Sequence, residues 1–357
     1  MCSSDLSFSV NEGAGSVHVT VTRSGDTTSA ATLEFATADG TANDRGDYTT
    51  AIGRLRFGPG DTAQAFDIFI TDDGYAEGNE TVQLTLSNPS AGALAGGTAT
   101  ALLTIVDNDL APSAANPIDG TAFFVRQHYV DFLNREPDAS GLAFWTGEIE
   151  SCGADAQCRE VKRINVSAAF FLSIEYQETG FLVERLYRAA FNRLPAYREF
   201  HRDTRQLGRG VVVGQGAWEA QLESNKQAFA SEFVAHTDFL AVYAGLTNEQ
   251  YVDALNVNTG NSLSSSERQA LVKGLNTATL TRATVLRQVA EDADFAAREL
   301  NRAFVLAQYL GYLRRDPDAA GLAFWLAKLE LFGGDFRRAE MVKAFISSDE
   351  YRLRFGQ

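Results

Sequence analysis

REPDASGLAFW, residues 135–145, returns near the other end of the chain as RDPDAAGLAFW, residues 315–325. Aligned without gaps at an offset of 180, residues 124–145 match residues 304–325 at thirteen of twenty-two positions. Two unrelated helices would share far fewer residues. We therefore interpret the region from Phe124 to the C-terminus as organised by an internal repeat.

Each copy places an amphipathic helix before a proline turn. Val125, Tyr129, Phe132 and Leu133 fall at helical spacing ahead of the first turn, and residues 305–313 repeat the stripe. The proline stops this helix, and the aspartate after it can accept hydrogen bonds from the free N–H groups of the next helix. The glycine one turn later permits close packing. The residues with these structural roles are Arg135, Pro137, Asp138, Gly141 and Trp145, and in the second copy Arg315, Pro317, Asp318, Gly321 and Trp325.

The apolar residues after the glycine are expected to form the buried face of the second helix. They are Leu142, Phe144 and Trp145 in the first copy and Leu322, Phe324 and Trp325 in the second. A binding role is the alternative, in which Asp138 and Asp318 hold calcium and the two tryptophans stack on sugars. We favour capping and core packing, because a structural residue must recur in each unit and a functional one need not.

Eroded copies lie between the two strong ones. Residues 181–195 keep the tyrosine-to-proline spacing but lose the continuation. A second motif closes the units as FFLSIEY, residues 170–176, and FISSDEY, residues 345–351. This arrangement indicates one cooperative helical domain rather than an open solenoid.

The two signatures, Tyr-x(5)-Arg-x-Pro-Asp-x-x-Gly-Leu-x-Phe-Trp and Phe-x-x-Ser-x-Glu-Tyr, resemble the bacterial domain of unknown function 4214. The resemblance covers residues 123–176 and 304–351. It implies a domain of secreted and surface proteins that often stands beside calcium-binding modules and has no established activity. The resemblance therefore indicates a location rather than a mechanism.

Residues 7–109 follow a period of two. Short runs in which apolar and polar residues alternate are separated by glycine and aspartate turns, which is typical of an antiparallel β-sandwich. The alternating apolar residues are Val17, Val19, Val21, Leu33, Phe35, Phe66, Ile68, Ile70, Val82, Leu84, Leu86, Ala101, Leu103 and Ile105.

Acidic residues collect where these strands would end. In a Greek-key sandwich alternate loops meet at one end, so the carboxylates would repel one another unless a divalent cation lay among them. Six to eight hard oxygens are what calcium takes. The candidate metal ligands are Glu12, Asp39, Asp72, Asp73, Glu77, Glu80, Asp107 and Asp109.

The motifs VNEGAG, TADGTA, GDYT, FGPGDT, DDGYAEGNET and TIVDND resemble a Calx-beta domain over nearly all of residues 7–109. The resemblance implies an immunoglobulin-like sandwich that binds Ca2+ through the same eight loop carboxylates. Asn108 departs from the acidic triplet of strong binders, which predicts weaker binding or fewer ions. Asp47, in GDYT, is interpreted as a turn cap and left out of the metal site. Turn capping and loop solvation are the alternative for all of these acids.

Negative charge is concentrated at the N-terminal end. Up to residue 110 the chain has fifteen Asp or Glu against four Arg and no Lys, which gives −11 of the total net charge of −15. Such a charge repels nucleic acid and anionic membranes and favours cations. No apolar run reaches the length of a membrane span.

The cysteines and the N-terminus indicate in which cellular compartment the protein is found. Cys152 and Cys158 are expected to close a small disulfide loop, as in an oxidising compartment, and two separate buried thiols are the alternative. MCSSDL, residues 1–6, resembles a translated sequencing adaptor rather than a signal peptide. We leave these six residues out of the fold and expect the natural protein to extend further upstream.

The sequence contains no catalytic constellation that we recognise. The histidines at positions 18, 128, 201 and 236 stand apart from any nucleophile motif, and there is no HExxH, GxSxG or phosphate loop. His128 is expected at the surface or rim of its helix. We therefore expect a protein that is not an enzyme.

These observations predict a multidomain protein. An all-β immunoglobulin-like antiparallel sandwich (residues 7–110) precedes a linker (111–120) and an all-α helical domain (121–357). The expected function is that of a calcium-binding structural, adhesion or surface-anchoring protein, extracellular or on the bacterial cell surface. A cell-surface protein or a polysaccharide is the further partner to consider. The alternative is a glycan-binding or enzyme-accessory module of a secreted protein.

Overall fold

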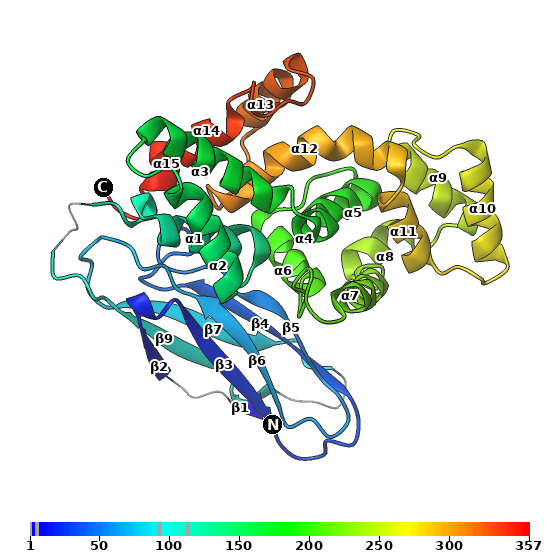
Figure 1. The fold of residues 1–357 in the computed structure, drawn as a ribbon. Helices are drawn as coiled ribbons and strands as arrows, with labels where there is room; N and C mark the ends of the chain where they lie inside the picture. The colour runs from blue at the N-terminus through cyan, green and yellow to red at the C-terminus, as the bar shows by residue number, and fades with distance from the viewer. Residues whose placement is uncertain (1, 4–6, 91–94, 112–114) are drawn as a thin grey trace. The chain divides into compact units, whose positions relative to one another are not determined.

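The alternating apolar runs form the strands of two sheets (Figure 1), in a computed structural model that describes residues 2–3, 7–90, 95–111 and 115–357. Residues 91–94 of the expected sandwich and residues 112–114 of the expected linker lie outside the described residues, as do Met1 and residues 4–6. Cys2–Ser3, which the sequence analysis left out of the fold, forms a short strand.

One sheet has the strand order β6-β3-β1-β8 and the other has the order β2-β9-β7-β4-β5. The strands are β1 (Cys2–Ser3), β2 (Ser7–Asn11), β3 (Ser16–Arg23), β4 (Ala31–Asp39), β5 (Ile52–Phe57), β6 (Ala63–Phe69), β7 (Glu80–Ser87), β8 (Ala95–Thr98) and β9 (Thr100–Val106). The inward residues of β3, β4, β6, β7 and β9 are buried in a single core cluster, as the alternation predicts. Phe35 and Phe66 stack at its centre with their ring centroids 3.9 Å apart.

The sandwich confirms the predicted fold class, but two strand pairs are parallel rather than antiparallel. Strand β2 runs parallel to β9, with Ser7 opposite Leu102 and Asn11 opposite Val106, and β1 runs parallel to β8. The alternation of residues shows which face of a strand is buried but not the direction of its neighbour. The predicted sandwich is therefore confirmed, with two parallel pairs that the alternation could not show.

The described residues divide by their contacts into two compact units, which are treated separately below. Unit 1 comprises Met1–Ala168, Gly311–Arg314 and Glu340–Gln357, and unit 2 comprises Ala169–Leu310 and Arg315–Ala339. Unit 1 thus contains the sandwich together with the first helices and the last residues of the chain. The division of the chain at residues 111–120 stays a prediction.

Both units contain helices, which confirms a helical region after the sandwich. Unit 1 holds α1 (Thr121–Leu133), α2 (Ala139–Glu150), α14 (Met341–Ile346), α15 (Asp349–Arg352), the 3-10 turn η2 (Pro117–Asp119) and most of α3 (Ala156–Phe171). Unit 2 holds α4 (Ile174–Tyr176), the π-helical turn η3 (Gln177–Phe181), α5 (Leu182–Phe191), α6 (Tyr197–Leu207), α7 (Trp218–Phe233), α8 (Thr237–Tyr243), α9 (Asn248–Asn258), α10 (Ser265–Asn276), α11 (Arg282–Ala290), α13 (Ala319–Leu331) and most of α12 (Ala293–Gly311).

The repeat motif forms the same helix–turn–helix twice. Asp138 caps α2 by accepting a hydrogen bond from the Gly141 N–H at 2.9 Å, and Asp318 does the same for α13 at 2.8 Å from the Gly321 N–H. The arginine of each turn lies over the tyrosine of the preceding helix, Arg135 at 4.9 Å from the Tyr129 ring centroid. These contacts explain the cap, the arginine and the tyrosine as structural parts of one turn.

The glycine of the motif is required by the same tyrosine. A Cβ atom on Gly141 would overlap the Tyr129 hydroxyl, and one on Gly321 would overlap the Tyr309 hydroxyl. The hydroxyl of the first helix therefore packs against the backbone of the second in both copies. This contact gives the predicted close packing a specific partner.

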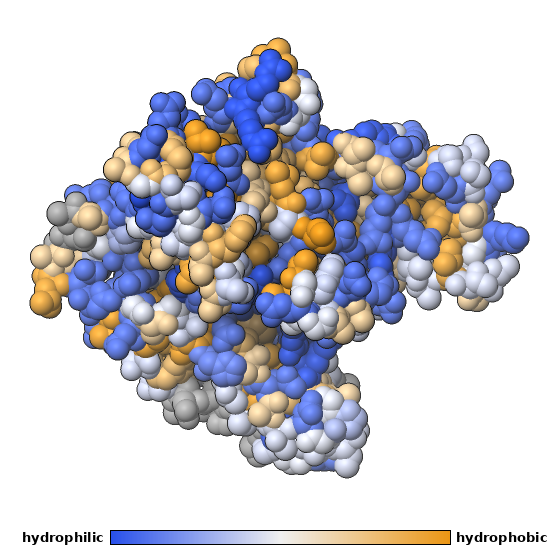
Figure 2. All heavy atoms as spheres, viewed as in Figure 1, coloured by the Kyte–Doolittle hydropathy of each residue, from blue (hydrophilic) through white to orange (hydrophobic). Residues whose placement is uncertain are grey.

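The expectation that the phenylalanine of each motif is buried was wrong. Phe144 is 59% exposed and Phe324 is 58% exposed, and Trp145 and Trp325 are half-buried. The buried stripe of α2 passes through Leu142 and Trp145 to Ile149 at helical spacing, and a residue two positions from Leu142 points away from it. Over α13, labelled in Figure 1, Figure 2 shows apolar side chains at the surface beside strongly hydrophilic ones.

Two further predictions concern α1 and α3. Cys152 and Cys158 are joined by a disulfide, with their Cα atoms 5.6 Å apart. The expectation for His128 was wrong, because its ring is fully buried and lies 2.7 Å from the Phe124 carbonyl and 2.8 Å from the Ser167 hydroxyl. Burial lowers the pKa of His128 to about 4, so this side chain belongs to the core in its neutral form.

No helix among the residues that the structure describes combines the length and the apolar character that a membrane crossing requires.

Gly141→Ala is expected to lower stability by about 1–3 kcal/mol, because the new methyl group overpacks the Tyr129 hydroxyl. Thermal unfolding would show the loss as a lower Tm. Gly147→Ala is the matched control in the same helix, where an added Cβ meets no atom within 4 Å. The control should gain up to about 1 kcal/mol from helix propensity. Equal effects of the two substitutions would contradict the packing role of Gly141.

Candidate metal centre

Strand pairing brings the acidic loops to one end of the sandwich. The last residue of β2, Asn11, lies opposite Val106 at the end of β9, and Glu80 at the start of β7 lies opposite Ile105. The first residue of β3, Ser16, pairs with Phe69 at the end of β6. The segments 12–15, 40–51, 70–79 and 107–109 therefore meet at this end, which we call the acidic end.

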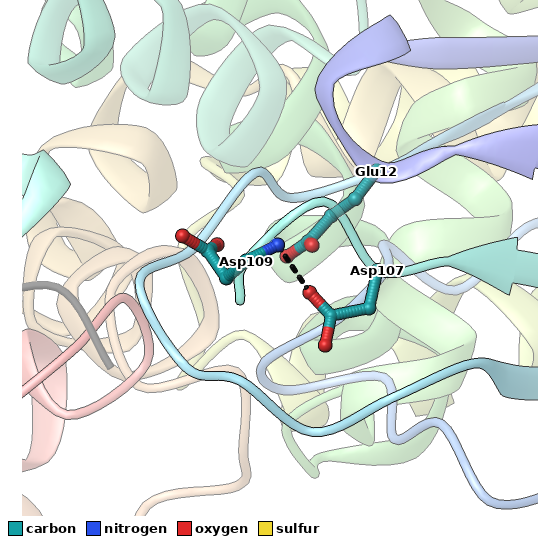
Figure 3. Close-up of side chains that lie close together, drawn as sticks. All are labelled: Glu12, Asp107 and Asp109. Atoms are coloured by element: carbon teal, nitrogen blue, oxygen red, sulfur yellow. Dashed lines mark hydrogen bonds between the residues drawn. The ribbon is translucent and has the colours of Figure 1, made fainter. Parts of the chain in front are cut away.

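The first acidic group consists of Glu12, Asp107 and Asp109. Each offers a carboxylate oxygen, and the three oxygens lie within 4.8 Å of one another. Figure 3 shows the three side chains close together, with the Asp109 N–H donating to Asp107 Oδ1 at 2.7 Å. The N–H groups of Glu77 and Gly78 donate to Asp107 Oδ2 at 2.9 and 2.6 Å. Asp107 is thus held rigidly by three amides.

The second acidic group consists of Asp47, Asp73 and Glu77, again with carboxylate oxygens within 4.8 Å of one another. Asp47 and Asp73 are buried, and Glu77 is exposed. Asp47 Oδ2 accepts hydrogen bonds from the Asn43 N–H at 2.7 Å and from the Asn43 amide side chain at 2.8 Å. The Asp73 N–H donates to Glu12 Oε1 at 3.0 Å, which links the two groups.

Sequence reasoning left Asp47 out of the site, yet the structure places it among the carboxylates. The local contacts agree with a turn cap, since Asp47 does accept the Asn43 N–H. A cap and a ligand are compatible, because a carboxylate has two oxygens and about four lone-pair sites. The GDYT motif was the signal that could have identified Asp47, since it lies within the resemblance to the Calx-beta domain.

Burial and mutual repulsion raise the pKa values of the buried acids. Burial is the larger cause for Glu12, with the charges of Asp72 and Asp107 adding to it, and the pKa of Glu12 is about 7. Burial, with the charges of Glu12, Glu77 and Asp47, raises the pKa of Asp73 to about 8. These groups therefore bind protons near neutral pH in the absence of a cation.

Burial and nearby charges also raise the pKa values of the neighbouring acids, with Asp107 as the exception. Burial and then Asp47 raise the pKa of Glu80 to about 8, and burial with the charges of Asp47 and Asp107 raises the pKa of Glu77. Partial burial also acts to raise the pKa of Asp107, but its three amide donors leave it below the ordinary range. Asp107 thus remains ionised where its neighbours are partly protonated.

The remaining predicted ligands lie beside the two groups. Glu80 is hydrogen-bonded to Asp47. Asp39 Oδ1 accepts from the Tyr48 hydroxyl at 2.7 Å and from the Asp44 N–H at 3.0 Å, so it supports the loop that carries Asp47. Asp72 accepts from the Asn108 side chain at 2.9 Å. Their assignment as ligands stays a prediction.

The donor set determines which ion the acidic end would suit. Within the described part of the chain, these are the two groups of three or more possible metal-ligating side chains that come together. All six members are carboxylates, without histidine or cysteine, and hard oxygen donors suit calcium or magnesium rather than zinc or copper. A cation would also remove the repulsion that raises the pKa values. The residues therefore fit a hard divalent cation.

Comparison with known families agrees with this geometry. Residues 4–109 match the Calx-beta domain family, and residues 288–355 match the family described as domain of unknown function DUF4214. The first match includes every residue of both acidic groups.

Similar proteins include sodium/calcium exchangers. The exchanger Calx of Drosophila melanogaster is 36% identical over 102 residues, which are 29% of this chain and 11% of the exchanger. Sodium/calcium exchanger 1 of Canis lupus familiaris is 35% identical over 116 residues, 28% of this chain and 12% of the exchanger. Adhesion G-protein coupled receptor V1 of Danio rerio is 31% identical over 139 residues, 39% of this chain and 2% of the receptor. The chain thus spans about a tenth or less of the length of these relatives.

Two solved structures are similar to the same region. The apo-form Calx CBD1 domain is 36% identical and covers 29% of this chain and 92% of its own, with a TM-score of 0.29. The calcium binding domain CBD12 of CALX1.1 is 34% identical and covers 30% of this chain and 46% of its own, with a TM-score of 0.30. In sequence order, the chain carries a Calx-beta domain at residues 4–109 and a DUF4214 domain at residues 288–355.

Proposed function

We propose that this protein binds calcium at the acidic end of its sandwich and acts as a non-enzymatic structural protein outside the cell. One observation carries the proposal: six carboxylates in two groups meet at the end of the sandwich, inside a Calx-beta domain. Glu12, Asp107 and Asp109 would hold one ion, and Asp47, Asp73 and Glu77 would hold a second. The similar proteins include sodium/calcium exchangers, which supports the choice of calcium.

The role of the ion follows from the electrostatics. Like charges within 4.8 Å oppose folding, and an ion that binds only the folded state stabilises it by mass action. Calcium would therefore make the sandwich rigid where calcium is abundant, as it is outside cells. The disulfide between Cys152 and Cys158 supports an oxidising location. Adhesion or surface anchoring through the helical region is the activity that we assign to the whole chain.

Substituting one carboxylate in each group tests the two ion sites. Glu77→Gln and Asp109→Asn should each weaken calcium binding about tenfold, which is about 1.4 kcal/mol. Isothermal titration calorimetry of the full chain measures the affinity and the number of ions. Both positions are at least partly exposed, so the fold should persist.

Asp26→Asn is the control for that experiment, because it removes the same charge from the opposite end of the sandwich. Asp26 lies beyond the end of β3, where its Oδ1 accepts from the Thr28 N–H and hydroxyl, and asparagine keeps this oxygen. Its calcium affinity should equal that of the unaltered chain. Unchanged affinity in Glu77→Gln would reject the second acidic group as a ligand set.

The raised pKa values predict how calcium and pH act together. Glu12, Asp73 and Glu80 have pKa values of about 7, 8 and 8 in the fold, so without calcium the folded state holds protons that the unfolded state releases. The stability from these protons is fully present below the ordinary carboxyl pKa values and is lost as pH rises through 7 to 8. Calcium needs the ionised forms and so replaces the protons.

Thermal unfolding in chelator should therefore show a lower Tm for the sandwich at about pH 8.5 than at about pH 5.5. Millimolar calcium should raise the Tm more at the higher pH, and sodium chloride at the same ionic strength is the control. A calcium shift that is larger at the lower pH would contradict the role of these carboxyls.

Glycan binding is a second candidate, and the exposed aromatic residues favour it. Phe144 and Trp145 lie with ring centroids 4.9 Å apart on α2, and Phe324 and Trp325 lie 5.1 Å apart on α13. The phenylalanine of each pair is more than half exposed, and aromatic faces at a surface suit stacking against sugar rings.

Replacing both exposed phenylalanines tests this candidate. Phe144→Ala combined with Phe324→Ala should reduce retention in affinity electrophoresis through bacterial polysaccharide at least severalfold, while leaving Tm nearly unchanged. Val257→Ala, at a position that is 66% exposed, controls for the loss of an ordinary apolar side chain. Equal retention of the double variant and the control would remove the aromatic pairs as a glycan platform.

A further inference from the structure

The loop that carries Asp47 has contacts on two sides. Its carboxylate belongs to the second acidic group. The main-chain carbonyls of the same loop accept hydrogen bonds from two arginines far along the chain. Arg314 Nη1 donates to the carbonyls of Asp44 at 3.2 Å and Tyr48 at 2.9 Å, and Arg354 Nε donates to the Arg45 carbonyl at 2.9 Å. All these residues belong to unit 1.

The two arginines are buried around a single carboxylate. Arg314 is 2% exposed, Arg354 is 4% exposed and Asp131 is 5% exposed. Arg314 Nη2 lies 2.9 Å from Asp131 Oδ1, and Arg354 Nη1 lies 3.1 Å from Asp131 Oδ2. The two guanidinium groups share the one carboxylate that they contact, and Arg314 also interacts with the charge of Asp47 on the same loop. A buried charge is costly unless hydrogen bonds satisfy it, so the loop carbonyls are necessary partners of the arginines.

The backbone of Arg314 points to the same role. Arg314 has a φ of 48°, in the left-handed region, at the end of the helix before the repeat turn. The corresponding positions in the other copies are Asn134, with a φ of 52°, and Asn192, with a φ of 50°. Asparagine adopts this conformation readily, whereas a larger side chain pays about 1–2 kcal/mol. The contacts of the Arg314 side chain account for an arginine at this position.

A second loop of the acidic end, residues 70–79, contacts residues 350–356, which include Arg354. We call residues 350–356 the C-terminal segment. The Gly74 N–H, next to Asp73, donates to the Phe355 carbonyl at 2.9 Å. The Tyr75 hydroxyl donates to the Leu353 carbonyl at 3.2 Å. Both loops that supply the second acidic group thus support this segment. The two arginines contact carbonyls and a hydroxyl of the loop, so an ion among the carboxylates would replace none of their bonds.

We propose that calcium bound at the second acidic group strengthens the docking of the C-terminal segment, residues 350–356, on the loops of the acidic end. Arg314 and Arg354 transmit this effect. This inference rests on the proposed calcium binding and adds that the bound ion orders another part of unit 1. An ion that fixes Asp47 also fixes the loop carbonyls that accept from the two arginines. An ion that fixes Asp73 also fixes the neighbouring N–H and hydroxyl groups that donate to the carbonyls of the C-terminal segment. Because coupling is reciprocal, loss of the docking contacts must weaken calcium binding by the same factor.

Arg314→Asn is the most direct test, since it installs the residue of the other copies and suits the left-handed backbone. Loss of a positive charge near Asp47 by itself favours a cation, so a fall in calcium affinity has to come from the lost docking contacts. The affinity, measured by calorimetry on the full chain, should fall about fivefold or more. Arg159→Gln is the matched control, because Arg159 is a half-buried arginine of unit 1 that donates to the Gly153 carbonyl at 2.9 Å and to the Glu150 carboxylate at 2.8 Å. The control should bind calcium as the unaltered chain does.

Hydrogen exchange of the unaltered chain tests the coupling without any substitution. Calcium should slow amide exchange in residues 350–356 severalfold, sodium chloride at the same ionic strength should not, and Arg314→Asn should abolish the calcium effect. Should Arg314→Asn fail to fold, Thr49→Val replaces it, since this change removes the hydroxyl that accepts from Arg314 Nη2 at 2.6 Å.

The possible failures are distinguishable. Calcium binding with unchanged exchange in residues 350–356, or with unchanged affinity in a folded Arg314→Asn, would overturn the coupling and leave the proposed function intact. Absence of calcium binding by the unaltered chain would overturn both.

Discussion

Repulsion between carboxylates at one end of the sandwich is the constraint on which the other features of unit 1 depend. The acids are not free to separate, because they also hold the loops together. Asp107 binds the N–H groups of Glu77 and Gly78, and Glu12 binds the N–H group of Asp73. Charge-assisted bonds of this kind are among the stronger ones in proteins. The residues that connect the strand ends are therefore the residues that repel one another.

This double use of the acids explains why the acidic end responds to both protons and cations. A carboxylate that already accepts amide hydrogen bonds stays in place whether or not a cation is present, as Asp107 does. A carboxylate such as Asp73, which is buried with fewer donors, must take up a proton or share a cation. The loops also have a second side, where their carbonyls face Arg314 and Arg354. In the coupling that we propose, a change in charge on one side of the Asp47 loop changes the order of the segment on its other side.

Much of this arrangement could be predicted from the sequence. Strict alternation identified the core of the sandwich, and the position of acids after each run identified the acidic end. Asp47 was missed because a short acid before an aromatic residue is a common turn cap, and local reasoning cannot show what lies across the sandwich from a loop. Phe144 was placed in the core because the end of its motif, GLAFW, has no polar side chain, although helical spacing already separates Phe144 from Leu142 and Ile149. The arginine contacts could not be predicted, because Asp131, Arg314 and the loop carbonyls meet only in the folded chain.

Comparing the copies of the internal repeat shows which residues have a structural role, because such residues make the same contact in each copy. Where the copies agree, as at Gly141 and Gly321, the structure shows the same contact with a tyrosine hydroxyl twice. Where they differ, the difference has a local reason. Asp131 aligns with Gly311, and a Cβ atom on Gly311 would overlap the Phe132 ring. Asn134 aligns with Arg314 at a backbone conformation that favours asparagine. An unfavourable residue at an otherwise repeated position has to be explained by a contact that the other copy does not make, and here that contact is with the loop of the acidic end.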